Sequence, residues 1–123
     1  MDFYDIVTDE PLLTDESGFG RESKDWTGDC RVWIRKHLQD TEHFFGLGDK
    51  PCALNLRGKY FSMWGADHYD FHEESDPLYK SIPFFLSLRE GRAYGLLFDN
   101  TCRSYFDFGA TDETVLSFGS FGG

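Results

Sequence analysis

Several residue types are scarce in this sequence, and each scarcity excludes a class of protein. Isoleucine and valine occur only three times each. No apolar run approaches the roughly 20 residues that a membrane-spanning helix needs, so we expect no membrane segment. The chain does not open with the basic residues of a signal peptide. Three widely spaced cysteines form neither a disulfide framework nor a zinc motif, and they indicate free thiols in a reducing compartment such as the cytoplasm.

Basic residues are also scarce, because 12 lysines and arginines stand against 22 acids, for a formal net charge of −10. The excess is uneven: residues 1–30 hold nine acids and two bases. An acidic chain without a basic stripe does not suit nucleic-acid phosphates or an anionic membrane surface. We therefore expect neither nucleic acid nor a membrane as a partner.

Aromatic residues take the place of the missing aliphatic ones, with 13 Phe, 6 Tyr and 3 Trp. Aromatic side chains bury large areas and pack well on β-sheets. The 13 Gly and 4 Pro fall mostly between apolar runs, as turn residues do. A chain of 123 residues forms one domain and is too short for a (β/α)8 barrel, which needs roughly 250 residues. The composition therefore favours an all-β domain.

Short apolar or alternating segments predict an antiparallel β-sandwich with little helix. The expected strands are residues 3–7, 12–13, 30–35, 43–48, 60–64, 82–88, 93–98, 103–108 and 115–118. The polar stretch 15–29 is interpreted as a loop, and 76–80 as one helical turn capped by Asp76. Residues 1–29 would form an acidic N-terminal segment of the same domain, and 30–123 its body.

The densest polar segment, residues 67–74, lies between two expected strands and allows three interpretations. On an extended chain His68, Asp70 and His72 would point to one face, as ligands of iron or zinc do. Asp67 and Asp70 could instead form a carboxylate pair for acid–base catalysis. Glycoside hydrolysis, for example, needs two carboxylates on opposite sides of the scissile bond, and two acids in one loop do not easily flank a sugar ring. Composition alone favours a solvated acidic loop. We expect no metal site and no cofactor.

One continuous block, residues 43–109, resembles a known family. It contains HFFGLGDK at 43–50, LRGKYFSMWGADHYDF at 56–71, DPLYKSIPFFLSL at 76–88 and AYGLLFDNTCRSYFDFG at 93–109. In this order and at these spacings the segments resemble the N-terminal β-sandwich domain of family 31 glycoside hydrolases, the α-glucosidase family. The resemblance implies a galactose mutarotase-like sandwich that packs on a catalytic (β/α)8 barrel of the same polypeptide.

The resemblance also implies a role for two residues. Family members commonly have Trp-Asn-Thr-Asp-Ala-Tyr where this chain has Trp-Gly-Ala-Asp-His-Tyr at 64–69. In the family this loop reaches the mouth of the active site, so Asp67 would hydrogen-bond the bound sugar and Tyr69 would support or stack on it. A carboxylate suits that role because it accepts two hydroxyl groups in charge-assisted hydrogen bonds. The changed residues around Asp67 could alter which sugar or linkage is accepted.

No residue of this chain is expected to be catalytic. The family's nucleophile lies in a Trp-x-Asp-Met-Asn/Glu-type motif of the barrel, and no such string occurs here. The resemblance implies a retaining parent enzyme that acts on an α-linked glucoside with two barrel carboxylates about 5 Å apart, while the 123 residues alone would be inactive. In the family another apolar strand follows, so we expect the sandwich to continue beyond Gly123.

Two other functions remain open from the residues. One is a free-standing carbohydrate-binding sandwich that uses Trp64, Asp67 and Tyr69 as a shallow sugar platform. The other is a structural interface domain without any sugar contact.

Overall fold

The computed structural model describes residues 2–6, 8–23, 30–67, 69–73 and 75–122. These residues contain ten β-strands and no helix. Within these residues no helix is long and apolar enough to span a membrane. The strands are β1 (Phe3–Tyr4), β2 (Pro11–Leu13), β3 (Asp15–Ser23), β4 (Cys30–His37), β5 (His43–Gly48), β6 (Tyr60–Met63), β7 (Ser81–Arg89), β8 (Arg92–Leu97), β9 (Ser104–Phe108) and β10 (Val115–Phe121).

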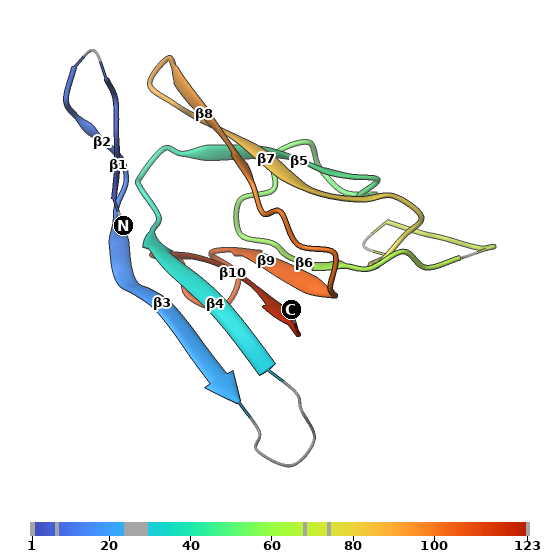
Figure 1. Ribbon diagram of the computed structural model, residues 1–123. Helices are drawn as coiled ribbons and strands as arrows, with labels where there is room; N and C mark the ends of the chain where they lie inside the picture. Colours follow the sequence, from blue (N-terminus) through green and yellow to red (C-terminus); the bar gives the residue numbers. More distant parts are fainter. Residues whose placement is uncertain (1, 7, 24–29, 68, 74, 123) are drawn as a thin grey trace.

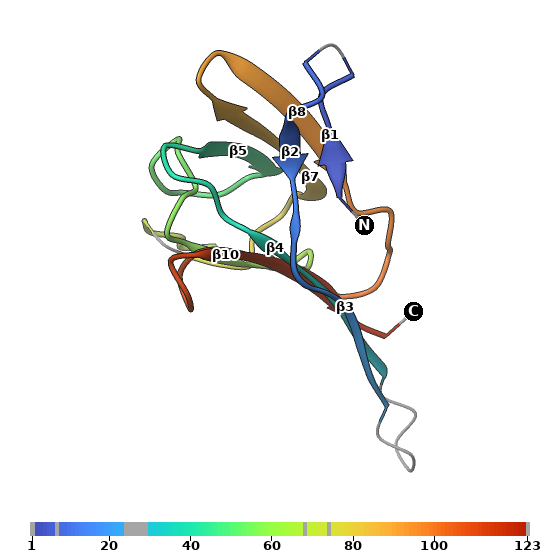
Figure 2. The same ribbon diagram turned by 90° about the vertical axis from the view of Figure 1, so that its left-hand side faces the viewer.

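The strands form two larger sheets and one small hairpin, all with antiparallel pairing (Figure 1). One sheet has the order β3-β4-β10-β9-β6, and the other has the order β5-β7-β8. The β1–β2 hairpin stands beside them. In the turned view of Figure 2 the two larger sheets lie one above the other. The expected all-β sandwich is therefore confirmed.

Phenylalanine fills the core between the two sheets. Phe44 of β5, Phe85 of β7, and Phe106 and Phe108 of β9 have no exposed surface. Their ring centroids lie 4.8–6.1 Å apart, in edge-to-face, tilted and stacked arrangements. Aromatic pairs of this kind contribute about 0.5–1.5 kcal/mol each beyond the area they bury. The aromatic core explains how a sandwich forms with so little isoleucine and valine.

Glu42 is a buried acid just before β5, and its hydrogen bonds connect this part of the chain to β7 and β8. The Oε1 atom accepts hydrogen bonds from the hydroxyls of Ser87 (2.5 Å) and Tyr94 (2.7 Å). The Oε2 atom accepts one from the backbone N–H of Gln39 at 3.2 Å. Burial, and then the Glu42 carboxylate, raise the pKa of Tyr94. These bonds offset the cost of removing a carboxylate from water and attach residues 39–42 to β7 and β8.

The loop expected over residues 15–29 is wrong for its first nine residues, because Asp15–Ser23 forms strand β3. This strand pairs with β4 in an antiparallel register that sets Gly20 opposite Trp33. It is an edge strand, so its hydrogen bonds to β4 hold it without an apolar core face of its own, and Phe19 is largely exposed. Residues 24–29 lie outside the described residues.

The helical turn expected at residues 76–80 is also wrong, since this segment is not helical and the Asp76–Pro77 peptide is cis. Asp76 does not cap a helix. Its carboxylate instead bonds the ammonium group of Lys50 and the backbone N–H of Ser62. The side chain that the local pattern assigned to a helix cap therefore bonds residues that are remote in the sequence.

Two cysteines of the described structure, Cys52 and Cys102, are free thiols. Both are half-buried rather than fully buried. Burial raises the pKa of the Cys52 thiol, which therefore stays protonated at neutral pH.

Candidate functional site

The connection between β6 and β7, residues 64–80, carries both residues predicted to contact a sugar. We call it the 64–80 loop; it extends beyond the end of the sheets at the right of Figure 1. Trp64, Phe71 and Tyr79 are about half exposed along it. Half-exposed aromatic side chains can contribute large apolar areas to a contact with another molecule or domain.

Asp67 and Tyr69 lie in the outer part of the 64–80 loop, and both are exposed. The Tyr69 side chain is as accessible as in an extended peptide, at 101%. Within the described part of the chain, neither side chain has a hydrogen bond or ion pair. His68, which lies between them, is outside the described residues. Both predicted side chains are thus available to a group outside this chain.

The base of the 64–80 loop, in contrast, is anchored to the sandwich. The ammonium group of Lys50 pairs with the carboxylate of Asp76 and donates a hydrogen bond to the carbonyl of Ser62 at 3.0 Å. Lys50 also lies over the ring of Phe61, 5.5 Å from its centroid. Farther along, the N–H of Ala66 donates to the carbonyl of Leu78, which is buried. The exposed residues are therefore presented from a fixed base.

The described residues of the loop do not form a metal centre. Asp70 and His72 are exposed, and Nδ1 of His72 is 2.8 Å from the hydroxyl of Ser75. Among the residues that the structure describes, no three His, Cys, Asp or Glu side chains are grouped as a ligand set. His68, the third member of the predicted trio, lies outside them.

Trp64 lines a hollow of about 580 Å³ at the root of the loop, with Asn100 and Pro83 among its other walls. Asn100 stabilises the turn before β9, because its Oδ1 accepts the N–H of Cys102 at 2.7 Å. Its Nδ2 donates to the hydroxyl of Ser120 at 3.0 Å. The polar atoms of Asn100 therefore serve the fold.

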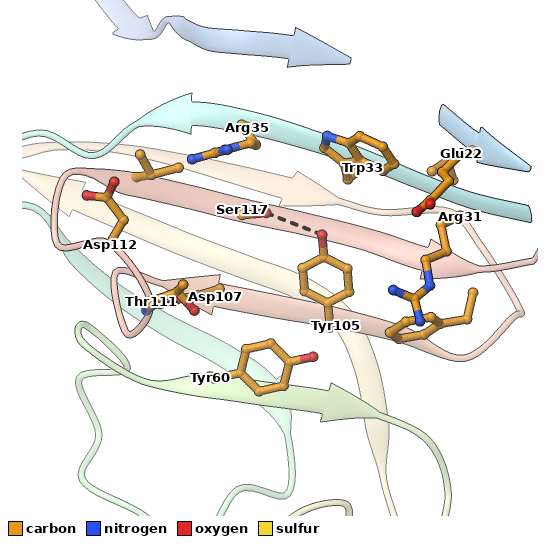
Figure 3. A pocket seen from close by; sticks show the side chains of 13 residues that line it. Glu22, Arg31, Trp33, Arg35, Tyr60, Tyr105, Asp107, Thr111, Asp112 and Ser117 are labelled. Atoms are coloured by element: carbon orange, nitrogen blue, oxygen red, sulfur yellow. Dashed lines mark hydrogen bonds between the residues drawn. The ribbon is translucent and has the colours of Figure 1, made fainter. Parts of the chain in front are cut away.

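A second hollow, of about 430 Å³, lies on the outer face of the five-stranded sheet (Figure 3). Its walls include Trp33 of β4, Tyr60 of β6 and Tyr105 of β9. Sequence reasoning did not identify this surface, because the three aromatic residues are far apart along the chain. The available signal was the alternation of Arg31, Trp33 and Arg35 with the apolar positions between them.

Comparison with known proteins supplies further evidence. The family described as the glycosyl hydrolase 31 N-terminal galactose mutarotase-like domain matches residues 2–107. Alpha-glucosidase 2 of Bacillus thermoamyloliquefaciens is 41% identical over 100 residues, which is 80% of this chain and 13% of that protein. The alpha-glucosidase of Saccharolobus solfataricus is 37% identical over 79 residues, which is 64% of this chain and 11% of that protein.

The fold is similar to solved structures of the same family. A glycoside hydrolase 31 dextranase of Flavobacterium johnsoniae, solved with isomaltotriose, superposes with a TM-score of 0.85 at 37% identity. The match covers 99% of this chain and 14% of the dextranase chain. The chain therefore spans about one seventh or less of the length of these relatives.

Proposed function

Because this chain belongs to the glycosyl hydrolase 31 N-terminal galactose mutarotase-like domains, we propose that it serves as the non-catalytic N-terminal domain of an α-glucosidase-like glycosidase. The domain packs against a catalytic (β/α)8 barrel of the same polypeptide. Its 64–80 loop supplies Asp67 and Tyr69 to the sugar-binding site of that barrel. The substrate class is an α-linked glucoside, as the names of the relatives, two α-glucosidases and a dextranase, suggest.

The observation that carries the proposal is the contrast between the fixed base and the free outer part of the 64–80 loop. Lys50 and Asp76 fix the base, while Asp67 has no hydrogen bond or ion pair among the described residues. A fixed base limits the region that the outer part of the loop can reach, which lowers the entropy cost of binding. The carboxylate of Asp67, on this loop, can accept hydrogen bonds from two hydroxyl groups of a sugar.

The outer face of the three-stranded sheet supports the proposed packing on a barrel. Four alternate residues of β7 point away from the core and are 39–52% exposed: Ile82, Phe84, Leu86 and Leu88. The face of β7 that points away from the core is thus an apolar row along the strand. A continuous apolar face of this kind is rarely left in water, so it favours contact with another part of a larger protein.

In this proposal the chemistry takes place on the barrel and this domain only positions the sugar. Retaining hydrolysis needs a nucleophile and an acid/base about 5 Å apart across the glycosidic bond, and the domain supplies neither. We therefore expect the purified 123-residue chain not to hydrolyse an aryl α-glucoside. Turnover that stays with the chain through several chromatography steps, above a blank from the host, would overturn the non-catalytic role.

The decisive experiment is kinetic and uses the full-length polypeptide. Loss of a hydrogen bond between Asp67 and a sugar hydroxyl costs about 1.5–3 kcal/mol, so Asp67→Ala should lower kcat/KM on maltose and isomaltose about 10- to 150-fold. Asp70→Ala is the matched control, since Asp70 is an exposed acid of the same loop. Its kcat/KM should stay within about twofold of wild type.

Circular dichroism and thermal unfolding must show that both variants are folded. An Asp67→Ala enzyme with wild-type kcat/KM would mean that the loop does not touch the substrate. The domain would then act only as a structural partner of the barrel.

A further inference from the structure

We propose that the outer face of the five-stranded sheet is a second carbohydrate-binding surface, which holds a neutral oligosaccharide away from the 64–80 loop. The preference for an α-glucan rests on the proposed function, whereas the surface itself is argued from its own residues. We call it the sheet groove; it consists of the hollow bounded by Trp33, Tyr60, Tyr105 and Phe121 (Figure 3). The volume of about 430 Å³ is in the range of small-ligand sites.

The strand register creates the groove. One row across the sheet runs through Gly20, Trp33, Gly119, Tyr105 and Ser62. Trp33 and Tyr105 are thus two strands apart, which separates their backbones by about 9.6 Å. Gly119 lies between them and has no side chain. The row therefore has an aromatic residue on each side of a glycine.

The two glycines of this row are required by close contacts. A Cβ atom on Gly119 would lie 2.2 Å from the carbonyl oxygen of Val32, so no side chain fits there. A Cβ atom on Gly20 would lie 2.1 Å from Cε2 of Trp33, which shows that the indole lies directly over Gly20. The indole therefore leans over β3, away from Gly119 and Tyr105. The strand register and the position of the indole thus keep the two aromatic side chains apart across the sheet.

Tyr60 and Tyr105 form the opposite wall as a pair of nearly parallel rings. Their planes differ by 11° and their centroids are 5.8 Å apart. In Figure 3 both rings turn their broad faces in the same direction, and the Tyr60 side chain is 48% exposed. The hydroxyl of Tyr105 is 3.3 Å from that of Ser117, which helps to fix its ring. Flat aromatic faces of this kind fit the apolar C–H face of a pyranose ring.

Polar groups at both ends of the groove suit the hydroxyl groups of such a ligand. Arg31 lies at one end, with its guanidinium group 5.0 Å from the centre of the Phe121 ring. Arg35 lies at the other end and pairs with Glu16 at 3.3 Å. Guanidinium groups can donate several hydrogen bonds in one plane, which matches adjacent hydroxyls.

The balance of charge favours a neutral ligand. Glu22, Asp107 and Asp112 line the same groove as its two arginines. The Asp107 carboxylate already accepts backbone N–H groups of residues 109–111, so it is a structural group. A site with both signs of charge attracts neither phosphate nor a polyanion strongly.

The sheet groove also differs from the apolar outer face of β7. Residues such as Phe84 and Leu86 on β7 offer only hydrocarbon, as an interface with another domain does. The groove instead combines aromatic faces with charged and hydroxyl groups, the combination that oligosaccharide recognition needs. A second point of attachment would raise the effective concentration of a long substrate near the catalytic site.

The test is a titration of the isotope-labelled 123-residue chain with isomaltotetraose and with maltotetraose, followed by NMR. We expect the amides of Trp33, Tyr105 and Gly119 to shift together, with a dissociation constant of millimolar order because the groove is shallow. Tyr105→Ala and Tyr60→Ala should each weaken binding about tenfold, or about 1.4 kcal/mol. Tyr105→Phe keeps the aromatic face and should bind nearly as well as wild type.

A second variant separates this inference from the proposed function. Asp67→Ala should leave the groove titration unchanged, because Asp67 lies on the 64–80 loop. Binding that is lost in Asp67→Ala but retained in Tyr105→Ala would place the sugar on the loop and overturn the groove. Absence of any shift at the groove up to roughly 20 mM ligand, well above a millimolar dissociation constant, would overturn it as well. The Asp67 kinetics of the full-length enzyme are independent of both outcomes.

Discussion

The ammonium group of Lys50 and the carboxylate of Asp76 form an ion pair between residues 26 positions apart, at the base of the 64–80 loop. The side chains are only 2% and 18% exposed. Both groups also bond the backbone of Ser62 in β6. Three segments meet at this pair: the turn after β5, strand β6 and the segment that leads into β7. The pair therefore sets where the loop leaves the sandwich.

Loss of this pair should destabilise the fold strongly. Lys50→Met leaves the Asp76 carboxylate in a poorly hydrated position without its cation, so we expect the free energy of unfolding to fall by about 3–5 kcal/mol. Urea unfolding followed by tryptophan fluorescence measures the change. Lys80→Met, at an exposed lysine nearby, is the control and should stay within about 0.5 kcal/mol of wild type. A loss below about 1 kcal/mol in Lys50→Met would mean that the pair does not anchor the loop.

The residues proposed to bind the sugar should contribute little to stability. Asp67 and Tyr69 have no hydrogen bonds or ion pairs among the described residues, so Asp67→Ala and Tyr69→Ala each have few native contacts to lose. We expect each to change the unfolding free energy by less than about 1 kcal/mol. Differential scanning calorimetry of the 123-residue chain checks this. A larger loss would show that the side chains have a structural role.

Tyr94 should make the fold sensitive to alkali. Its pKa is raised in the folded state, by burial first and then by Glu42, above the value of about 10 for an unfolded tyrosine. The folded state therefore holds this proton more tightly, and the stabilisation is complete below about pH 10 and is lost as the pH rises further. Tyr94→Phe should give a shallower decline of unfolding free energy above pH 10, measured by urea unfolding at several pH values.

A matched variant makes the pH experiment specific. Tyr69→Phe alters a fully exposed ring and should keep the wild-type dependence on alkaline pH. Parallel curves for Tyr94→Phe and wild type would refute the role of Tyr94. Some decline is expected to remain in Tyr94→Phe, since burial also raises the pKa of Tyr60.

A charge introduced on the outer face of β7 should destabilise the full-length protein but not the 123-residue chain. Leu86→Glu introduces a carboxylate at a position that is already 40% exposed, so the 123-residue chain should lose less than about 1 kcal/mol of unfolding free energy. In the full-length polypeptide the same charge would be buried against the barrel and should cost several kcal/mol, seen as a lower melting temperature. Leu54→Glu, at an exposed site off this face, is the control. Equal effects of Leu86→Glu in the two proteins would argue against docking at β7.

Local sequence patterns predicted most strands because each pattern belongs to one strand and its adjacent turns. The segment 43–48 is β5 without any change, and the hairpin expected at 82–88 and 93–98 is β7 and β8 to within one residue at each end. Strand β3 was missed since its stability comes from the backbone of β4 rather than from its own apolar side chains. Asp76 was misassigned because its partner Lys50 is remote in the sequence.

The sequence alone was enough to predict an all-β sandwich with an aromatic core, its family, and an exposed loop around Asp67. Alternation with a period of two assigns each side chain to one face of its strand, and turn residues mark the ends. Which strands become neighbours depends on how the sheets pack, and this only the tertiary structure decided. It brought Trp33, Tyr60 and Tyr105 to one groove on the outer face of the five-stranded sheet. It also joined Lys50 to Asp76, because ion pairs across 26 residues follow from the folded path of the chain.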